Sequence, residues 1–554
     1  MEKKRLIVIG GVAAGTKAAS KAKRENPELE VIILTKEKDI SYAGCGLPYY
    51  VGGIISERKE LVVRTAEDFD RDQDITVLTE HEVTKIDPQA KTITYDNKVK
   101  AEIKTMAYDS LVLAMGASPV LPKLDGRELA NIHTLRTPTD AEAVRKLVDA
   151  GKVKDAIVVG AGFIGLEAAE NLHHRGVNVT IVEFAPLILP GYDEEMSIYV
   201  KNYLIENGVN IRTGVGVSGF VGDETGKVSG VKIGEEELPA QLVIWAGGVK
   251  PNVALAKEAG IEIGPTGAIA VNEYQETNIP GIYAAGDCTE NTHLITKEKV
   301  WFAMGSTANK TGRIAGLNIV KEKADYLPGV LGTSIVKLFD LNAARTGLTE
   351  KQAIEKGYKV ESVIVPGNDR AHYFPGYRQI NTKLIADSTN GRILGAQIIG
   401  EGIVDKPIDI IATAISFEGT LEQISRLDLA YAPPFSMAMS STILAANVLR
   451  NKIEGKYKGI NPRDLKKAVE NNEIEVLDVR TEAEHFLKAI PGSINIPEDE
   501  LEARKDEIPQ NKRVVIACKV GKRAYLSQHR LRKLGCNDLR IMDGGIDCYC
   551  YDLN

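Results

Sequence analysis

The feature that most limits the possible folds of this chain is a run of strand, glycine loop, helix and strand that occurs twice. The first copy covers residues 5–34 and the second covers residues 154–183. In each copy a short apolar run ends at glycine and leads into a helical pattern, which is typical of a βαβ unit with buried parallel strands. Two such units predict two Rossmann-like domains, each with a dinucleotide site at its glycine loop.

The second glycine loop carries the complete GxGxxG pattern. Its glycines are Gly160, Gly162 and Gly165. The first permits a tight turn, the second lets a pyrophosphate approach the backbone, and the third allows the helix to pack closely on the strand. Glu183 ends the next strand, where a carboxylate binds the ribose hydroxyls and repels a 2′-phosphate. We therefore expect NADH to bind here in preference to NADPH.

The first glycine loop departs from this pattern. Gly10 and Gly15 are present, but Val12 stands at the position of the middle glycine. Lys36 and Glu37 occupy the place where an acid that binds ribose is expected. This loop alone is weaker evidence for a dinucleotide than the second loop.

A later strand end strengthens the assignment of the first loop. The apolar segment 282–285 leads directly to Gly286 and Asp287. An aspartate after such a glycine can bind a ribityl hydroxyl, which makes FAD the expected ligand, and NADH would reduce FAD by hydride transfer. The residues predicted to bind FAD are Gly10, Gly15, Glu37, Ser41, Gly116, Gly286 and Asp287.

Length and composition exclude several classes of protein. With 554 residues the chain is too long for one hydrophobic core, and its net charge of −7 argues against a nucleic-acid-binding protein. No run of 18 apolar residues and no secretion signal are present, so we expect a cytoplasmic protein without a membrane segment. The six cysteines include no CxxC pair, which indicates neither a disulfide framework nor a metal site.

The same patterns predict an α/β chain of several domains. Residues 328–450 lack a glycine loop and alternate strands with helices, which suggests a role such as dimerisation. Residues 451–460 are polar and contain glycine, as expected of a linker, and residues 461–554 form a further α/β pattern. The expected order is FAD-binding (1–149), NAD(H)-binding (150–247), FAD-binding again (248–327), dimerisation (328–450), linker (451–460) and a C-terminal domain (461–554).

Cys45 stands alone where a pair of redox cysteines might be expected. It lies in the segment 41–50, soon after the first βαβ unit, and the next cysteine is Cys288. A redox role for Cys45 would therefore need a partner sulfur from a substrate or a bound thiol, or else a reactive oxygen species. We expect a neighbouring helix N-terminus and the flavin to favour its thiolate, which is the reactive form.

A second isolated cysteine begins a six-residue loop between a strand and a helix. This loop runs from Cys518 to Arg523, and backbone amides at such a helix start can stabilise a thiolate or persulfide. Lys519, Lys522 and Arg523 add positive charge, so Cys518 is a candidate carrier of sulfane sulfur, with Arg523 assisting. Cys548 and Cys550 near the chain end could relay sulfur, but frayed terminal thiols are commoner.

Together these residues resemble the pyridine nucleotide-disulfide oxidoreductases. Residues 1–450 are similar to the single-cysteine branch, which includes coenzyme A disulfide reductases, NADH oxidases and NADH peroxidases, through the segments 41–50 and 429–435. Residues 461–554 resemble a rhodanese domain through the segments 477–480 and 490–497. The resemblance implies two Rossmann-like dinucleotide-binding domains, an α+β dimerisation domain and a C-terminal α/β rhodanese domain.

The resemblance also implies roles for particular residues. Cys45 matches the cysteine that faces the flavin and forms a mixed disulfide with coenzyme A. Lys21 and Arg24 match basic positions that contact coenzyme A phosphates, and Tyr373 and Tyr431 match tyrosines that reach the partner's cysteine in a homodimer. The chain departs from the family pattern at three positions, which are Gly44 for Asn, Phe374 for Tyr and Arg370 for His.

The predicted activity is the NADH-dependent reduction of persulfide, polysulfide or coenzyme A-linked sulfur. In the leading hypothesis, coenzyme A persulfide gives coenzyme A and hydrosulfide through a mixed disulfide at Cys45, while Cys518 carries sulfane sulfur. Three alternatives are open at this point. They are a coenzyme A disulfide reductase, an NADH oxidase or peroxidase, and a non-enzymatic protein for sulfur trafficking or redox sensing.

Overall fold

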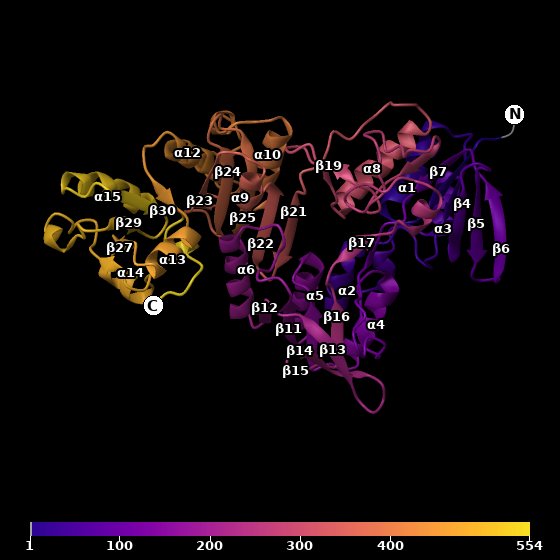
Figure 1. The fold of residues 1–554 in the computed structure, drawn as a ribbon, viewed down its shortest axis with the longest axis horizontal. Coiled ribbons are helices and arrows are strands. Elements are labelled where there is room, and N and C mark those ends of the chain that lie inside the picture. Colours follow the sequence, from indigo (N-terminus) through magenta and orange to yellow (C-terminus); the bar gives the residue numbers. More distant parts are fainter. Residues whose placement is uncertain (1–2) are drawn as a thin grey trace. The chain divides into compact units, whose positions relative to one another are not determined.

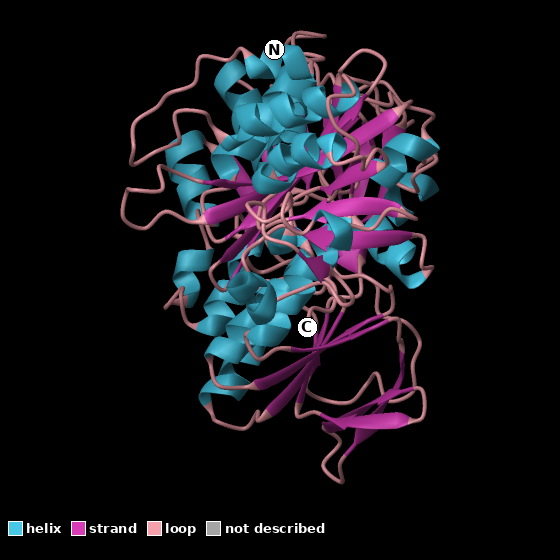
Figure 2. Ribbon diagram, turned by 90° about the vertical axis from the view of Figure 1, so that its left-hand side faces the viewer, coloured by secondary structure: helices cyan, strands magenta, loops and turns pink. Residues whose placement is uncertain are grey.

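The computed structural model describes residues 3–554, which divide into two compact units (Figure 1). The first unit contains Met1–Pro186 and Arg212–Val330, and the second contains Leu187–Ile211 and Leu331–Asn554. Helices and strands are mixed throughout the described residues (Figure 2). None of the helices in the described range has both the length and the apolar character needed to cross a bilayer.

The first unit begins with a five-stranded parallel sheet in the order β18-β7-β1-β2-β3. Every residue of β1 from Leu6 to Val8 is fully buried, because helices or loops cover both faces of the sheet. The helices α1 (Ala13–Glu25) and α8 (Gly305–Asn318) pack closely, since a Cβ on Gly312 of α8 would overlap the Ala14 backbone of α1. The strands are β1 Arg5–Ile9, β2 Glu30–Leu34, β3 Ile75–Leu78, β7 Ser110–Leu113 and β18 Ile282–Ala284.

A second five-stranded sheet repeats this plan in the order β12-β11-β10-β16-β9. Its central strand β10 pairs in parallel with β11 and β16, as β1 does with β2 and β7. The prediction of two βαβ units is therefore confirmed. The strands are β9 Ile132–His133, β10 Asp155–Val159, β11 Asn178–Glu183, β12 Asn210–Thr213 and β16 Leu242–Trp245.

Shorter elements complete the first unit. Two antiparallel three-stranded sheets are β4-β5-β6 and β13-β14-β15. Their strands are β4 His81–Asp87, β5 Thr92–Asn97, β6 Glu102–Ala107, β13 Val217–Gly222, β14 Val228–Ile233 and β15 Glu236–Pro239. The short pairs are β8 Ala117–Pro119 with β17 Val249–Pro251, and β19 Asn291–Thr292 with β20 Lys299–Val300. The helices are α2 Leu47–Gly52, α3 Ala66–Gln73, α4 Pro138–Asp149, α5 Phe163–His174 and α7 Ala254–Glu258, with 3₁₀ turns η1 Gly44–Gly46 and η2 Arg58–Leu61.

The second unit contains an antiparallel sheet in the order β21-β22-β25-β24-β23. All residues of β25 are buried, including the polar Gln397. Helix α6 (Glu194–Glu206) follows the second βαβ unit in sequence but belongs to this unit, where Asp193 accepts a hydrogen bond from Gln397. The other elements are β21 Ser334–Leu338, β22 Leu341–Gly347, β23 Val360–Asn368, β24 Gln379–Asp387, β25 Ile393–Gly400, α9 Glu350–Glu355, α10 Asp405–Ser416, α11 Leu421–Ser425 and α12 Ser441–Ile453.

A parallel sheet in the order β26-β30-β29-β27-β28 forms the C-terminal part of the second unit. Within the expected linker at 451–460, α12 extends to Ile453 and β26 begins at Gly459. Tyr457 between them is buried, whereas residues 454–456 are exposed. The elements are β26 Gly459–Ile460, β27 Ile474–Asp478, β28 Ile494–Asn495, β29 Arg513–Ala517, β30 Leu539–Met542, α13 Pro462–Glu470, α14 Glu482–Leu487, α15 Lys522–Lys533, η3 Lys505–Glu507 and η4 Ile546–Cys548.

Candidate active site

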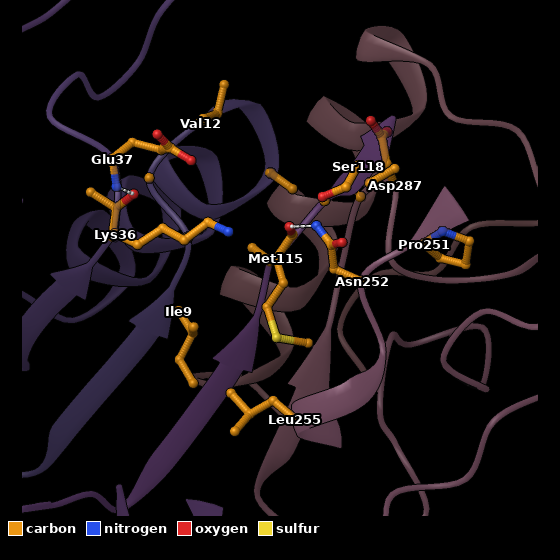
Figure 3. Close-up of a pocket in the computed structure, with 18 of the residues that line it drawn as sticks. Ile9, Val12, Lys36, Glu37, Met115, Ser118, Pro251, Asn252, Leu255 and Asp287 are labelled. Carbon is orange, nitrogen blue, oxygen red and sulfur yellow. Dashed lines mark hydrogen bonds between the residues drawn. The ribbon is translucent and has the colours of Figure 1, made fainter. Parts of the chain in front are cut away.

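A cavity of about 540 Å³ opens at the carboxyl ends of β1, β2 and β7 (Figure 3). This edge of a parallel sheet is where nucleotides bind in doubly wound folds. Most of the residues predicted to bind FAD line the cavity, and Figure 3 shows Glu37 and Asp287 at its rim together with Val12. The predicted lining residues found there are Gly10, Glu37, Gly116, Gly286 and Asp287.

The glycines of the first loop allow a close turn between β1 and α1. Gly10 has a φ of +111°, and a Cβ there would overlap the carbonyl oxygen of Ala114. Gly15 lies against the Gly10 carbonyl in the same way, so it shapes the turn without lining the cavity. Helix α1 begins after Val12 without a side-chain cap or an acid in its first turn, which leaves its amides available to an anion. The residues present therefore fit the pyrophosphate of FAD.

Arg136 and Asn252 also line the cavity and were not identified from sequence. Burial raises the pKa of Asp287, while the nearby Arg136 guanidinium acts against that rise. Arg136 lines the same cavity and donates from Nε to the Ala117 carbonyl at 2.9 Å. Asn252 donates to the Met115 carbonyl at 2.8 Å, as Figure 3 shows. Arg136 and Asn252 come from segments without a recognisable motif. The sequence indicated this part of the site only through the strand that ends near Met115.

Ser41 has a structural position beside the cavity. Its backbone N–H donates to the Gly11 carbonyl at 2.7 Å, and its φ of +51° is unusual for a residue with a side chain. Ser41 is not among the lining residues, whereas its neighbour Tyr42 is. The structure therefore assigns Ser41 to the turn that leads into the Cys45 segment.

The second glycine loop repeats the contacts of the first. A Cβ on Gly160 would overlap the Ala246 carbonyl, and one on Gly165 would overlap the Gly160 carbonyl. A Cβ on Gly162 would meet nothing within 4 Å, so this position is open to an approaching ligand. Helix α5 starts after Gly162 without a side-chain cap or an acid in its first turn, which fits the pyrophosphate of NAD(H).

Glu183 lies at the end of β11 with its carboxylate held by the backbone. Oε2 accepts a hydrogen bond from the Ala161 N–H, and Oε1 accepts one from the Ala185 N–H, each at 2.7 Å. The first of these bonds connects the carboxylate directly to the glycine loop. Glu183 is thus presented beside the loop, as an acid that binds ribose requires.

Cys45 lies in the 3₁₀ turn η1 and is exposed. The charged side chains around it do not favour its thiolate. Burial raises the pKa of Cys45, and the negative charges of Glu167 and Asp287 raise it further. Glu167 belongs to α5, more than a hundred residues from Cys45 in sequence, and no motif connected the two.

Tyr373 and Tyr431 come together on the second unit. Their hydroxyl oxygens are 3.3 Å apart, and the two residues are 65% and 49% exposed. The hydrogen bond to Tyr431 raises the pKa of Tyr373. The ring of His372 packs edge-on against Tyr373, with 5.4 Å between the centroids. The structure thus forms a surface pair from two tyrosines that sequence resemblance had selected separately.

The two basic residues predicted on α1 differ in their surroundings. Lys21 pairs with Glu25, which also pairs with Lys321, and these two lysines lower the pKa of Glu25 to about 2. Arg24 is exposed on the same helix. Arg24 is therefore better placed than Lys21 to receive an anion from solution.

Cys518 is buried at the end of β29, where backbone amides surround its sulfur. Sγ accepts hydrogen bonds from the Gly521 N–H at 3.1 Å and the Ala524 N–H at 3.3 Å. Gly521 adopts a φ of +94°, which turns the loop back over the sulfur. Amides in this arrangement stabilise an anionic sulfur, as the loop pattern predicted.

Arg523 does not point freely toward Cys518. Its guanidinium forms two hydrogen bonds of 2.7 Å with the carboxylate of Glu484 on α14. This bidentate pair lowers the pKa of Glu484 to about 2. Arg523 therefore joins α14 to the start of α15, while its charge still acts on Cys518.

The remaining cysteines are packed thiols. Cys548 and Cys550 are both 5% exposed, so the expectation of frayed terminal thiols was wrong. The carbonyl of Cys550 accepts a hydrogen bond from Asn202, which fixes the chain end against α6. Cys288 is fully buried beside the cavity-lining segment, and burial raises its pKa to about 11. Cys536 is also buried.

Three family models match the chain in the order seen in the structure. Residues 4–317 match "Pyridine nucleotide-disulphide oxidoreductase", residues 333–443 match its "dimerisation domain", and residues 461–550 match "Rhodanese-like domain". These matches confirm the expected fold class. The exact domain limits that we predicted stay predictions.

Individual relatives agree with the family models. The "NAD(P)H sulfur oxidoreductase (CoA-dependent)" of Pyrococcus furiosus is 38% identical over 81% of this chain and 100% of its own length. The solved structure of reduced CoADR-RHD from Bacillus anthracis is 36% identical, with a TM-score of 0.93 over 99% of this chain and 98% of that chain. The structure of an NAD-dependent persulfide reductase from A. fulgidus is 41% identical, with a TM-score of 0.93 over 98% of this chain and 100% of that chain. The chain belongs to the pyridine nucleotide-disulphide oxidoreductases.

Proposed function

We propose that this flavoenzyme uses NADH to reduce persulfide, polysulfide or coenzyme A-linked sulfur. The observation that carries the proposal is the presence of two separate sulfur centres in one chain. Cys45 is an exposed thiol close to the charges of the nucleotide cavity, and Cys518 is a thiol surrounded by amides. The names of the relatives from Pyrococcus furiosus and A. fulgidus support sulfur as the acceptor.

The residues around the cavity would bind the cofactors. The amides at the start of α1 and the Gly10 turn would hold the FAD pyrophosphate, and those at the start of α5 would hold that of NADH. Glu183 would bind the ribose hydroxyls of NADH and disfavour a 2′-phosphate. FAD, when bound, supplies the two-electron connection between NADH and a disulfide at Cys45.

Cys45 would perform the sulfur exchange. Its thiolate attacks the sulfur that is bonded to coenzyme A in the persulfide, the S–S bond breaks, and hydrosulfide leaves with the electron pair. The product is a disulfide between Cys45 and coenzyme A. Two electrons from NADH and the proton released with them then give the Cys45 thiolate and free coenzyme A. Overall, NADH and coenzyme A persulfide become NAD⁺, coenzyme A and hydrosulfide.

Cys518 would carry sulfane sulfur on the rhodanese-like domain. The amides of Gly521 and Ala524 that reach its sulfur would equally stabilise a persulfide anion. Arg523 would contribute by its charge and by holding the loop through Glu484. We expect the protein to act in the cytoplasm, where both thiols remain reduced between cycles.

We further propose a homodimer in which the tyrosine pair serves the partner's active site. Tyr373 and Tyr431 are exposed on a domain of the dimerisation family, and each hydroxyl can donate a hydrogen bond. In the dimer they would donate to the sulfur that departs from Cys45 of the partner subunit. Arg24, together with Lys21, would bind the phosphates of coenzyme A.

The proposal is tested with the FAD-loaded protein, NADH and coenzyme A persulfide under anaerobic conditions. We expect NADH oxidation with equimolar release of hydrosulfide, and loss of both in Cys45→Ser. Cys536→Ser is the matched control for Cys45→Ser, because it removes a packed thiol of the rhodanese-like domain and leaves Cys45 in place. Unchanged turnover in Cys45→Ser would refute the proposal.

A coenzyme A disulfide reductase is the second candidate, because Cys45 could attack that disulfide without help from Cys518. Comparison of kcat/KM for coenzyme A disulfide and coenzyme A persulfide distinguishes the two activities. A much higher value for the disulfide, unaffected by Cys518→Ser, would favour the second candidate. Oxygen-dependent NADH consumption with no sulfur acceptor would instead indicate an oxidase.

A further inference from the structure

The helix that follows Cys45 is packed directly against the helix that follows the second glycine loop. Helix α2 begins two residues after Cys45 and contacts α5 along its length. A Cβ on Gly52 of α2 would overlap the Asn171 side chain of α5, which shows how close the two helices are. The segment that presents Cys45 is thus in contact with the NAD(H)-binding helix.

One polar contact crosses this interface near the thiol. The Tyr49 hydroxyl on α2 donates to Glu167 Oε1 on α5 at 3.3 Å. Cys45 lies four residues before Tyr49, in the 3₁₀ turn η1 that leads directly into α2. The charge of Glu167 acts on the Cys45 sulfur. A carboxylate, a phenol and a thiol from three elements therefore form one group.

Burial is the largest influence on the pKa values of this group, and neighbouring negative charges act in the same direction. Burial raises the pKa of Glu167 to about 7, with the hydrogen bond from Tyr49 acting against the rise and Glu170 adding to it. The charge of Glu167 in turn raises the pKa of Cys45. Tyr49 faces Glu167 from α2, Glu170 faces it from α5 itself, and Asp287 acts on Cys45 from the segment after β18.

We propose that Glu167, held by Tyr49, is a positioning residue that controls whether Cys45 is a thiol or a thiolate. With Glu167 ionised, repulsion keeps the proton on the Cys45 sulfur. When Glu167 takes a proton, the thiolate forms more readily, so the pair can exchange one proton, with Cys45–SH and Glu167–COO⁻ on one side and Cys45–S⁻ and Glu167–COOH on the other. The net charge of the pair remains −1 throughout, as expected of coupled titrating groups.

This inference deepens the proposed function, because it rests on Cys45 as the reacting thiol. It gives the nucleotide-binding helix a direct influence on sulfur reactivity. A purely structural role for Glu167 would predict only that its loss loosens α2 from α5. A control of protonation predicts a change in the pH at which Cys45 reacts, which can be measured without any sulfur substrate.

The test measures the alkylation rate of Cys45 by iodoacetamide against pH in the FAD-loaded protein, with the modified peptide quantified by mass spectrometry. In Glu167→Gln we expect the midpoint to move to lower pH, with alkylation about tenfold faster below the wild-type midpoint. Tyr49→Phe removes the hydrogen bond that lowers the pKa of Glu167, so Glu167 remains protonated to a higher pH. We therefore expect the alkylation midpoint to move to lower pH here too, but by less. Glu142→Gln is the control, because Glu142 lies on α4, which also packs on α2, and pairs with Arg58 and Lys146.

An alkylation midpoint in Glu167→Gln that equals that of Glu142→Gln would overturn the inference. If Glu167→Gln does not bind FAD, the alkylation curve of Tyr49→Phe decides. An alkylation midpoint in Tyr49→Phe equal to that of the wild type would then overturn the inference. A shifted alkylation curve in a protein that fails to reduce coenzyme A persulfide would refute the proposed function alone. Persulfide reduction with unshifted curves would refute this inference alone.

Discussion

Lys452 Nζ lies 2.8 Å from Asp543 Oδ2, and the two side chains are only 9% and 2% exposed. Lys452 belongs to the last turn of α12, and Asp543 follows β30 of the C-terminal sheet. The same ammonium group reaches Glu361 at 3.1 Å. This buried pair joins the rhodanese-like domain to the antiparallel-sheet domain. We therefore expect the domain that carries Cys518 to be packed against its neighbour and not joined to it by a flexible linker alone.

Loss of this pair should weaken the second unit. We predict that Lys452→Met lowers the free energy of unfolding by about 3 kcal/mol, because Asp543 would remain buried without its cation. Urea unfolding followed by circular dichroism measures the effect. Lys456→Met is the control, since Lys456 is 52% exposed and should change stability by less than about 0.5 kcal/mol. Equal stability of the two variants would contradict a structural role for the pair.

The pair of Arg523 and Glu484 should make the Cys518 loop sensitive to acid. Because the folded-state pKa of Glu484 is about 2, below its ordinary value of 4.5, the pair stabilises the fold above pH 4.5. That contribution is lost as the pH falls from 4.5 through 2. We predict that Arg523→Met removes this part of the acid dependence, measured as the thermal midpoint at a series of pH values. Parallel curves for variant and wild type would contradict the assignment.

Cofactor preference should depend on Glu183. We predict that Glu183→Gln raises the ratio of kcat/KM for NADPH to that for NADH by about tenfold, because the carboxylate no longer repels the 2′-phosphate. Of the two amides that hold this side chain, those of Ala161 and Ala185, one can still donate to the single Gln oxygen. Asp155→Asn, at the opposite end of the neighbouring strand, is the matched control. An unchanged ratio would show that another residue selects the cofactor.

The tyrosine pair should affect catalysis rather than folding. Tyr431→Phe removes one hydroxyl of the pair while the ring remains, so we predict a fall in kcat of about ten- to a hundredfold with little change in thermal midpoint. Tyr377→Phe is a suitable control, because Tyr377 is also an exposed tyrosine of this domain, at 43%. Steady-state kinetics with coenzyme A persulfide make the comparison. Equal kcat values for the two variants would assign Tyr431 a role in packing only.

Much of the fold and of the cofactor sites was predictable because their signals are local. The turns at Gly10 and Gly160 need glycine for reasons that arise within a few residues, namely a positive φ and close helix packing. The Cys518 loop is equally local, since its amides come from residues 521 and 524. Apolar runs such as β29 appeared at their predicted positions because burial on both faces leaves a continuous pattern.

The remaining features depend on contacts between distant segments. Asp193 binds Gln397 across 204 residues, which brings α6 into the second unit although it follows the NAD(H) loop in sequence. The thiols at 548 and 550 are buried because the chain end packs on α6, where composition alone indicated a frayed terminus.

By itself, the sequence determined that this protein has two dinucleotide loops, a lone cysteine after the first and a second cysteine at a helix start. Only the tertiary structure decided the chemical environment of the lone cysteine. Tyr49 and Glu167 are 118 residues apart, and their contact arises from the packing of α2 on α5. Desolvation and charge repulsion come from whatever the fold places nearby, so the direction of the shift in the Cys45 pKa became visible only once the chain was folded.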